Sequence, residues 1–332
     1  MVFKKLLGSL GVGGPTVDTT LPQGAAAPGG SLDGEVRLRG GSADSRIEHI
    51  TLELVARVEA EHEEGESEGG VVFARFTVAD GFVLHQDEEL GIPFSVALPW
   101  ETPVTELHGQ DLGIVLGVRT ELSVAGARDK GDLDRLAVRP LPAQEAVLEA
   151  LGQLGFGFRS ADLELGHIHG TGQQLPFYQE IELSPSARYA DRIGEIEVTF
   201  LAGSDGIEVV LEADSRGGHL SEGGDSLSRF TVGHHEAGGR DWVTEMDGRI
   251  RALADARTPH DAHAAYGYAH GHTGGQEHHR SGPGMGTVVA AGAAGVAVGV
   301  VGGLVAAEVV DEVGDFFEGE ESDEGEEGGE EG

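Results

Sequence analysis

The feature that most constrains the fold of this chain is an alternation of apolar and polar residues with a period of two. In residues 50–59, isoleucine, leucine, alanine and valine occupy every second position. Successive side chains of a strand point to opposite faces, so this run predicts a strand with one buried face. Similar runs predict strands at 34–39, 71–78, 92–98, 114–124, 133–139, 161–165, 178–183, 195–200 and 207–213.

Turn-forming residues separate these runs. Examples are ADG at 79–81 and LGIP at 90–93, and a glycine pair at 203–206 predicts a hairpin between the last two strands. Many short strands at such spacing are typical of antiparallel sandwiches. The predicted fold class is therefore all-β.

Three segments have helical periodicity instead. Apolar residues recur every three to four positions in 143–156, with Pro142 just ahead, and again in 241–257. A shorter amphipathic run covers 3–10. We expect short helices at the N-terminus, between two β regions and after the second one.

The 332 residues are enough for two domains of ordinary size. We expect two antiparallel β-sandwich lobes followed by a disordered C-terminal tail. The expected segments are an N-terminal amphipathic helix and linker at 1–14, a first sandwich at 15–140, an inter-lobe helix at 141–156, a second sandwich with its terminal helix at 157–258, a His-rich linker at 259–284, a Gly/Ala/Val-rich apolar segment at 285–310 and an acidic tail at 311–332.

Charge and cysteine content exclude several functions. The chain has 22 basic and 58 acidic side chains, a net charge of −36, which repels nucleic acid and anionic lipid headgroups. No nucleic-acid partner is expected. The absence of cysteine excludes disulfides, thiolate metal sites and a cysteine nucleophile. The apolar run near the start is too interrupted by glycine for a secretory signal, so the expected location is the cytoplasm.

Histidines in the tail are the candidate metal ligands, because imidazoles bind Zn²⁺, Ni²⁺ and Cu²⁺. The alternative is a solvated linker that binds metal only adventitiously, and the loose spacing favours it. A second pair, His167 and His169, would face one side of a strand, where hydrogen bonding or solvation is the favoured account. The tail candidates are His260, His263, His270, His272, His278 and His279.

The uncharged segment 281–307 has the length of a membrane span, and Gly295, Gly299 and Gly303 repeat four residues apart. Its many glycines make it weakly hydrophobic, and 12 acidic residues follow it in 311–332. These features favour self-association or a flexible linker over membrane contact through 285–307.

The sequence offers no support for catalysis. It has no GxSxG elbow, no GxxxxGK[ST] phosphate loop and no GxGxxG after a strand. The acids Glu61, Glu63, Glu64, Glu66 and Glu68 suit a solvated loop tip better than a cation site. We therefore expect a non-enzymatic protein without catalytic residues or a cofactor.

Several stretches that follow one another over most of residues 1–255 carry a recognisable pattern. They are FKKLLGSLGVGGPTVDTTL, GEVRLRGGSADSRIEHITLEL, IPFSVALPWETPVT, VRTELSVAGARDKGDLDRLAVRP, AVLEALGQLGF, LPFYQEIEL and EIEVTFLAGSDGIEVVLEADSRGG. Their order and spacing resemble the sporulation-control (stage-zero M) family. The resemblance implies an arrestin-like fold of two β-sandwich lobes, with Pro93, Pro99 and Pro103 at the ends of a strand. It also implies a regulatory role in sporulation or in envelope- and division-linked processes. The acidic surface here argues against phosphopeptide binding of the kind known for eukaryotic arrestins.

Three functions follow as hypotheses. The leading one is an adaptor or regulator that binds protein partners through sandwich edges and loops. The second is a metal-buffering protein that uses the tail histidines. The third is a membrane-associated scaffold that uses the glycine-rich segment.

Overall fold

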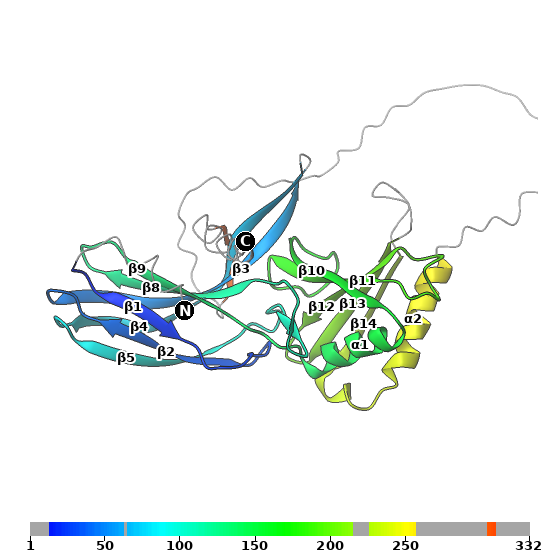
Figure 1. Ribbon diagram of the computed structural model, residues 1–332, viewed down its shortest axis with the longest axis horizontal. Coiled ribbons are helices and arrows are strands. Elements are labelled where there is room, and N and C mark those ends of the chain that lie inside the picture. Colours follow the sequence, from blue (N-terminus) through cyan, green and yellow to red (C-terminus); the bar gives the residue numbers. More distant parts are fainter. Residues whose placement is uncertain (1–12, 63–64, 215–225, 257–303, 310–332) are drawn as a thin grey trace, which may run out of the picture.

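The computed structural model describes residues 13–62, 65–214, 226–256 and 304–309. These residues form two lobes that lie end to end along the longest axis of the molecule (Figure 1). Strands dominate both lobes, which confirms the predicted β-rich fold, and helices follow the first and second lobes as expected. The N-terminal helix, expected at 3–10, lies outside the described residues.

The first lobe consists of two packed sheets. One contains β1 (Thr16–Thr20), β2 (Ser31–Arg39) and β5 (Glu89–Ala97), in the order β1-β2-β5. The other contains β3 (Ser45–His62), β4 (Gly65–Leu84), β8 (Leu116–Val124) and β9 (Lys130–Arg135). Apolar residues at alternate positions of both sheets form the core between them, among them Val36, Leu38, Leu52, Leu54, Phe73 and Val118. This is the sandwich that the period-two runs predict.

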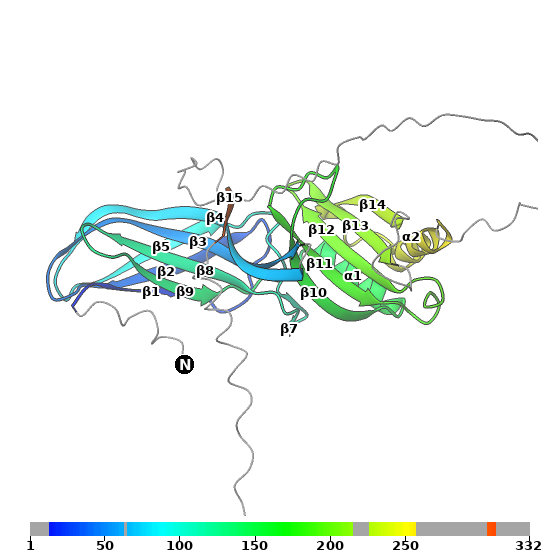
Figure 2. The same ribbon diagram turned by 90° about the horizontal axis from the view of Figure 1, so that it is seen from above.

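The second lobe is built on one antiparallel sheet. Its order is β10 (Gly157–Leu165), β11 (Phe177–Ser184), β12 (Glu195–Ala202), β13 (Gly206–Asp214) and β14 (Ser226–Gly233). The layer that faces this sheet is helical, formed by α1 (Pro142–Gln153) and α2 (Trp242–Ala256) (Figure 2). Buried residues of the shared core include Val147, Leu151, Ile196, Val198, Leu211, Met246 and Ile250. A short 3-10 turn, η2 (His234–Glu236), precedes α2.

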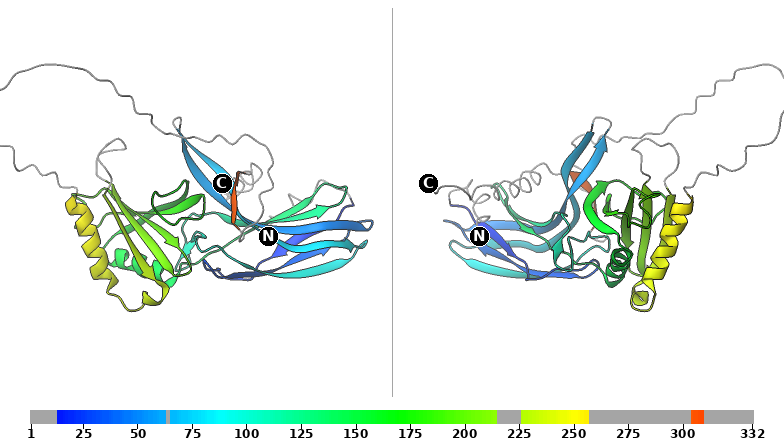
Figure 3. Two further views of the ribbon diagram at one scale, coloured as in Figure 1. Left: turned by 180° about the vertical axis from the view of Figure 1, so that it is seen from behind. Right: turned by 45° about the vertical axis from the view of Figure 1, so that its right-hand side comes forward.

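The two lobes are joined through their strands. The long hairpin of β3 and β4 extends beyond the first lobe, and β3 lies beside β10 with Glu59 opposite Glu164 (Figure 3). The hydrogen-bonded order β14-β13-β12-β11-β10-β3-β4 therefore runs across both lobes. The lobes share an edge instead of being linked only by the chain.

The segment that connects β5 with β8 also crosses the junction. It contains the short strands β6 (Glu106–Leu107) and β7 (Gln110–Asp111). The buried side chain of Gln179 on β11 donates a hydrogen bond to the carbonyl of Val104 (2.8 Å) and accepts one from its N–H (2.9 Å). The carboxylate of Glu101 accepts the N–H groups of Gln174 and Leu175, both at 2.8 Å. These bonds fix residues 101–104 on the second lobe.

Two predicted turns in the first lobe are wrong. Residues 79–81 lie inside β4 and residues 90–93 lie inside β5. The pairing of β3 with β4 shifts register next to residues 79–81, with Ile50 opposite Ala79 and Thr51 opposite Thr77. Pro93 consequently lies within β5 and not at its end, which is tolerated because β5 is the edge strand of its sheet.

Part of the tail also differs from its prediction. Within the apolar segment 285–310, residues Leu304–Val309 form strand β15, which pairs antiparallel with β4. This part of the tail is therefore not disordered. β15 pairs with the backbone groups at the edge of β4 that faces away from β3, and valines such as Val305 and Val309 favour an extended conformation. Residues 257–303 and 310–332 lie outside the described residues. Within the described part of the chain, no helix is long and apolar enough to cross a membrane.

Deleting residues 257–332 is expected to cause concentration-dependent self-association. The deletion removes β15 and exposes the edge of β4, and an open strand edge pairs readily with another chain. Sedimentation velocity between low and high protein concentration measures this. The matched control lacks only residues 310–332, which removes the 12 acidic residues of the tail and keeps β15. Equal association of both truncated chains would contradict the role of the β4 edge.

Candidate functional site

The sheet of the second lobe has an acidic face. Residues on β11, β12 and β13 alternate, so that Ile181, Val198 and Leu211 pack against the helical layer while glutamates occupy the opposite face. Acids lie directly opposite one another across neighbouring strands, in the pairs Asp162 with Glu180, Glu182 with Glu197 and Glu197 with Glu212. Like charges in directly opposite positions destabilise a sheet. A cation bound beside these acids would relieve the repulsion, so this face is a candidate binding surface.

A pocket with a volume of about 210 Å³ lies on the acidic face. It combines three carboxyl groups with a tyrosine ring, a hydroxyl and two aliphatic side chains. The lining residues are Ile168, Tyr178, Glu180, Glu197, Thr199, Val210 and Glu212. We call this the acidic pocket.

The loop of residues 166–176, between β10 and β11, supplies Ile168 to the acidic pocket. The amide of Gln173 holds the loop from inside. It accepts the N–H of Ile168 (2.9 Å) and donates to the carbonyls of Gly166 (2.7 Å) and Leu175 (2.8 Å). Arg229 on β14 holds the loop from outside by donating to the carbonyl of Gly170 at 2.9 Å. The loop is thus held both by bonds within it and by a bond to β14.

Burial and mutual repulsion hold one carboxyl of the acidic pocket protonated at neutral pH. Burial, reinforced by the neighbouring acids Glu197, Asp162, Glu164 and Glu212, raises the pKa of Glu180 to about 8. Burial and the same kind of acidic surroundings also raise the pKa of Tyr178. Both shifts arise because burial and the nearby acids disfavour a further negative charge in the pocket. A bound cation would oppose this effect and favour ionised Glu180.

The lining suits a long cationic side chain. Carboxylates form charge-assisted hydrogen bonds with guanidinium and ammonium groups. The ring of Tyr178 can contact a cation through its face, and the aliphatic stem of a lysine or arginine packs on apolar groups such as Ile168 and Val210. The acidic pocket therefore has the chemistry of a receptor for lysine or arginine.

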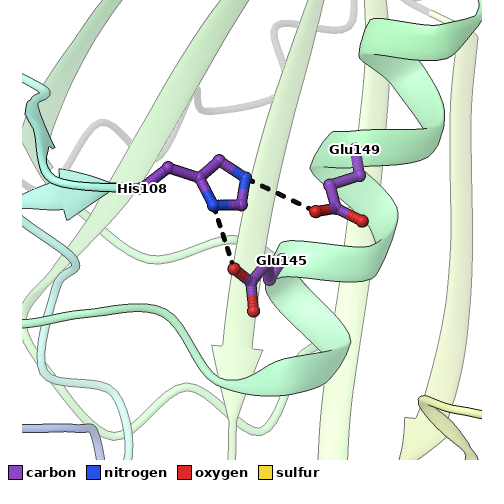
Figure 4. A group of neighbouring side chains, drawn as sticks. All are labelled: His108, Glu145 and Glu149. Carbon is purple, nitrogen blue, oxygen red and sulfur yellow. Dashed lines mark ion pairs between the residues drawn. The ribbon is translucent and has the colours of Figure 1, made fainter.

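A second group of titratable residues lies at the junction of the lobes. His108 occupies the two-residue turn between β6 and β7, where His108 and Gly109 both have positive φ (52° and 78°), as in a type I′ turn. Its Nδ1 lies 3.2 Å from Oε1 of Glu145, and its Nε2 lies 3.5 Å from Oε1 of Glu149 (Figure 4). Both glutamates project from α1, one helical turn apart. We call these three residues the junction triad.

No histidine singled out in the sequence is among the described residues that line the acidic pocket or form the junction triad. The six tail histidines, His260 to His279, lie outside the described residues, and their metal binding stays a prediction. The pair His167 and His169 was expected on a strand, but β10 ends at Leu165 and both lie in the loop 166–176. The reason is local, since the N–H of Gly166 bonds to the carbonyl of Pro176 and closes the connection there.

The acids of the first lobe were expected at a loop tip. Glu61, Glu66 and Glu68 instead lie within β3 and β4, because the hairpin pairing continues to His62 opposite Gly65. Glu63 and Glu64 lie outside the described residues. Neither the acidic pocket nor the junction triad was identified from the sequence, although the glutamates at alternate positions of 178–183, 195–200 and 207–213 carry the signal for an acidic face.

The chain is similar to known proteins across both lobes. A family model described as "SpoOM protein" matches residues 3–217. The sporulation-control protein spo0M of Bacillus subtilis (strain 168) is 37% identical over 216 residues, which cover 64% of this chain and 81% of that protein. The crystal structure of Spo0M from Bacillus subtilis superimposes with a TM-score of 0.64 and 31% identity, over 74% of this chain and 99% of that one.

Proposed function

Because the chain belongs to the SpoOM protein family of sporulation-control proteins, we propose that it is a non-enzymatic regulator that binds a protein partner in its acidic pocket. The pocket receives a lysine or arginine side chain from a basic segment of that partner. The observation that carries this proposal is the grouping of three carboxyl groups, those of Glu180, Glu197 and Glu212, around a cavity of about 210 Å³. Catalytic residues are not part of the proposal.

The energetics of the acidic face support binding of a cation. Glu197 lies between Glu182 and Glu212 in the sheet, with an acid directly opposite on each side. A guanidinium group placed beside Glu197 and Glu212 would convert this repulsion into charge-assisted hydrogen bonds. A guanidinium group should therefore bind more tightly in the acidic pocket than beside an isolated surface carboxylate.

The charge of the whole chain supports the same partner class. A net charge of −36 attracts cationic segments from a distance and speeds their encounter with the protein. This long-range attraction is not selective among acidic positions. Selectivity comes from the pocket, where the aliphatic groups of Ile168 and Val210 and the ring of Tyr178 contact the stem and head of the side chain.

The proposal is tested with a fluorescently labelled peptide of alternating arginine and glycine. We expect the full chain to bind this peptide in fluorescence anisotropy, and Glu197→Gln to weaken binding about tenfold, since a hydrogen bond to a charged group contributes about 1.5–3 kcal/mol. A peptide with citrulline in place of arginine should not bind.

The matched control is Glu35→Gln, which removes one negative charge from β2 in the first lobe, far along the chain from the acidic pocket. We expect this variant to bind the arginine peptide within about twofold of the unmodified chain, because a single exposed charge contributes little at ordinary ionic strength. Equal losses in Glu197→Gln and Glu35→Gln would show that only the overall charge attracts the peptide and would refute the pocket.

A further inference from the structure

We propose that the junction triad of His108, Glu145 and Glu149 is a binding site for a divalent transition cation of the zinc class, which fastens the β6–β7 turn to α1. This site is separate from the acidic pocket and does not depend on the proposed function. Its ligands are one imidazole nitrogen and two carboxylates, a set that Zn²⁺ accepts in proteins, with water completing the coordination.

The distances within the junction triad fit a shared ion. One ligand atom from each residue can be chosen so that all three lie within 4.8 Å of one another. The separation of 3.2 Å between His108 Nδ1 and Glu145 Oε1 is close to the separation of about 3.3–3.6 Å that tetrahedral geometry gives for two ligands with bonds of about 2.0–2.2 Å to one Zn²⁺. These two atoms therefore need little movement to bind an ion.

Glu149 completes the set by a side-chain rotation. It lies on the Nε2 side of the imidazole, 3.5 Å away, and one ion binds only one of the two ring nitrogens. About half of the Glu149 side chain is exposed (51%), so solvent leaves it room to turn toward the ion at Nδ1. Glu145 and Glu149 already share one helix face, because residues four apart in a helix are neighbours.

The local backbone presents these side chains from two different elements. His108 is held at the tip of a tight turn by its left-handed conformation, and both glutamates belong to a helix packed in the second-lobe core. The turn lies in the segment that leaves the first lobe at β5. An ion held by all three residues would thus link the connecting segment to the second lobe. This link would add to the bonds that Gln179 makes to Val104.

The test is a titration of the full chain with Co²⁺, a spectroscopic substitute for Zn²⁺, followed by visible absorption. We expect the unmodified chain to bind about one Co²⁺ more than the variant His108→Asn. The tail histidines contribute equally to both proteins, so the difference spectrum reports the junction triad alone. Asparagine tolerates the left-handed conformation of residue 108 well, which preserves the turn.

Two further variants make the test decisive. Glu149→Gln should weaken the binding of this Co²⁺ at least tenfold, as measured by the same absorption. The far-ultraviolet circular dichroism should stay unchanged. His85→Asn is the matched control, because it removes another exposed histidine paired with a carboxylate, Asp44 at 3.1 Å, that belongs to no group of three possible ligands among the described residues. Identical Co²⁺ spectra for the unmodified chain and His108→Asn would overturn the proposal and leave the junction triad as an ion pair only.

Discussion

Replacing Glu53 with alanine is expected to destabilise the protein by about 3–5 kcal/mol, the cost of breaking a buried ion pair by removing one partner. The side chain of Glu53 is only 2% exposed. It accepts the Nε–H groups of Arg75 and Arg119, both at 2.6 Å, one with each carboxylate oxygen. The two arginines lie directly opposite Glu53 on the strands that flank β3. Without the carboxylate, two guanidinium groups would remain side by side without their shared partner.

Urea denaturation of the unmodified and variant chains measures this change in the free energy of unfolding. Glu35→Ala is the matched control. It removes a glutamate from an ion pair with Arg37 whose side chains are 40% and 58% exposed, and such surface pairs contribute less than about 1 kcal/mol. If Glu53→Ala were no more destabilising than Glu35→Ala, the buried pair would not stabilise the first lobe.

Glu53 also shows where periodicity stops being informative. In residues 50–59 the alternation correctly predicts a strand, and it assigns Glu53 to the polar face. That face is buried at Glu53 because β3 is a central strand whose neighbours on both sides carry long arginine side chains over it. Strand existence is a local property and can be predicted from the residues of the strand itself. The burial of a polar face depends on neighbours that are distant in the sequence.

The same distinction explains the fold as a whole. Helices at 142–153 and 242–256 and the hairpin closed by Gly203 and Gly206 follow from local patterns, and they form as predicted. The pairing of β3 with β10 and of β15 with β4 joins segments about one hundred and more than two hundred residues apart. Periodicity carries no information on such pairs. The sequence therefore predicts the elements well and their connections poorly.

The acidic pocket required the same non-local information. Alternate glutamates on three neighbouring strands are visible in the sequence, but the pocket exists because the loop 166–176 is held over them. Arg229, about sixty residues later in the chain, helps to hold the loop by donating hydrogen bonds to the carbonyls of His169 and Gly170. The resemblance to the sporulation-control family identified the family correctly, yet it assigned no residue to a site.

Replacing Glu180 with glutamine is expected to stabilise the protein by about 2–4 kcal/mol at pH 8.5 and to have little effect at pH 4.5. The pKa of Glu180 is about 8 in the folded chain, against an ordinary value of 4.5 for an exposed glutamate. Between these two values the unfolded chain releases the proton and the folded chain keeps it, so stability falls as the pH rises. Below about pH 4.5 both states hold the proton and the residue contributes no pH dependence. Above about pH 8 the full loss of stability from Glu180 is present. Glutamine cannot ionise, so the variant does not lose this stability.

Urea denaturation of both chains at several pH values between 4.5 and 8.5 tests this prediction. The difference between their free energies of unfolding should grow with pH.

Binding of the arginine peptide should lower the pKa of Glu180, because a cation in the acidic pocket favours the ionised carboxylate. The unmodified chain should therefore release a proton when it binds at pH 7 and bind more tightly at pH 8.5 than at pH 6. In Glu180→Gln this pH dependence should be reduced. A constant difference in stability across the range would show that Glu180 ionises normally, and it would contradict the expected coupling between its protonation and peptide binding.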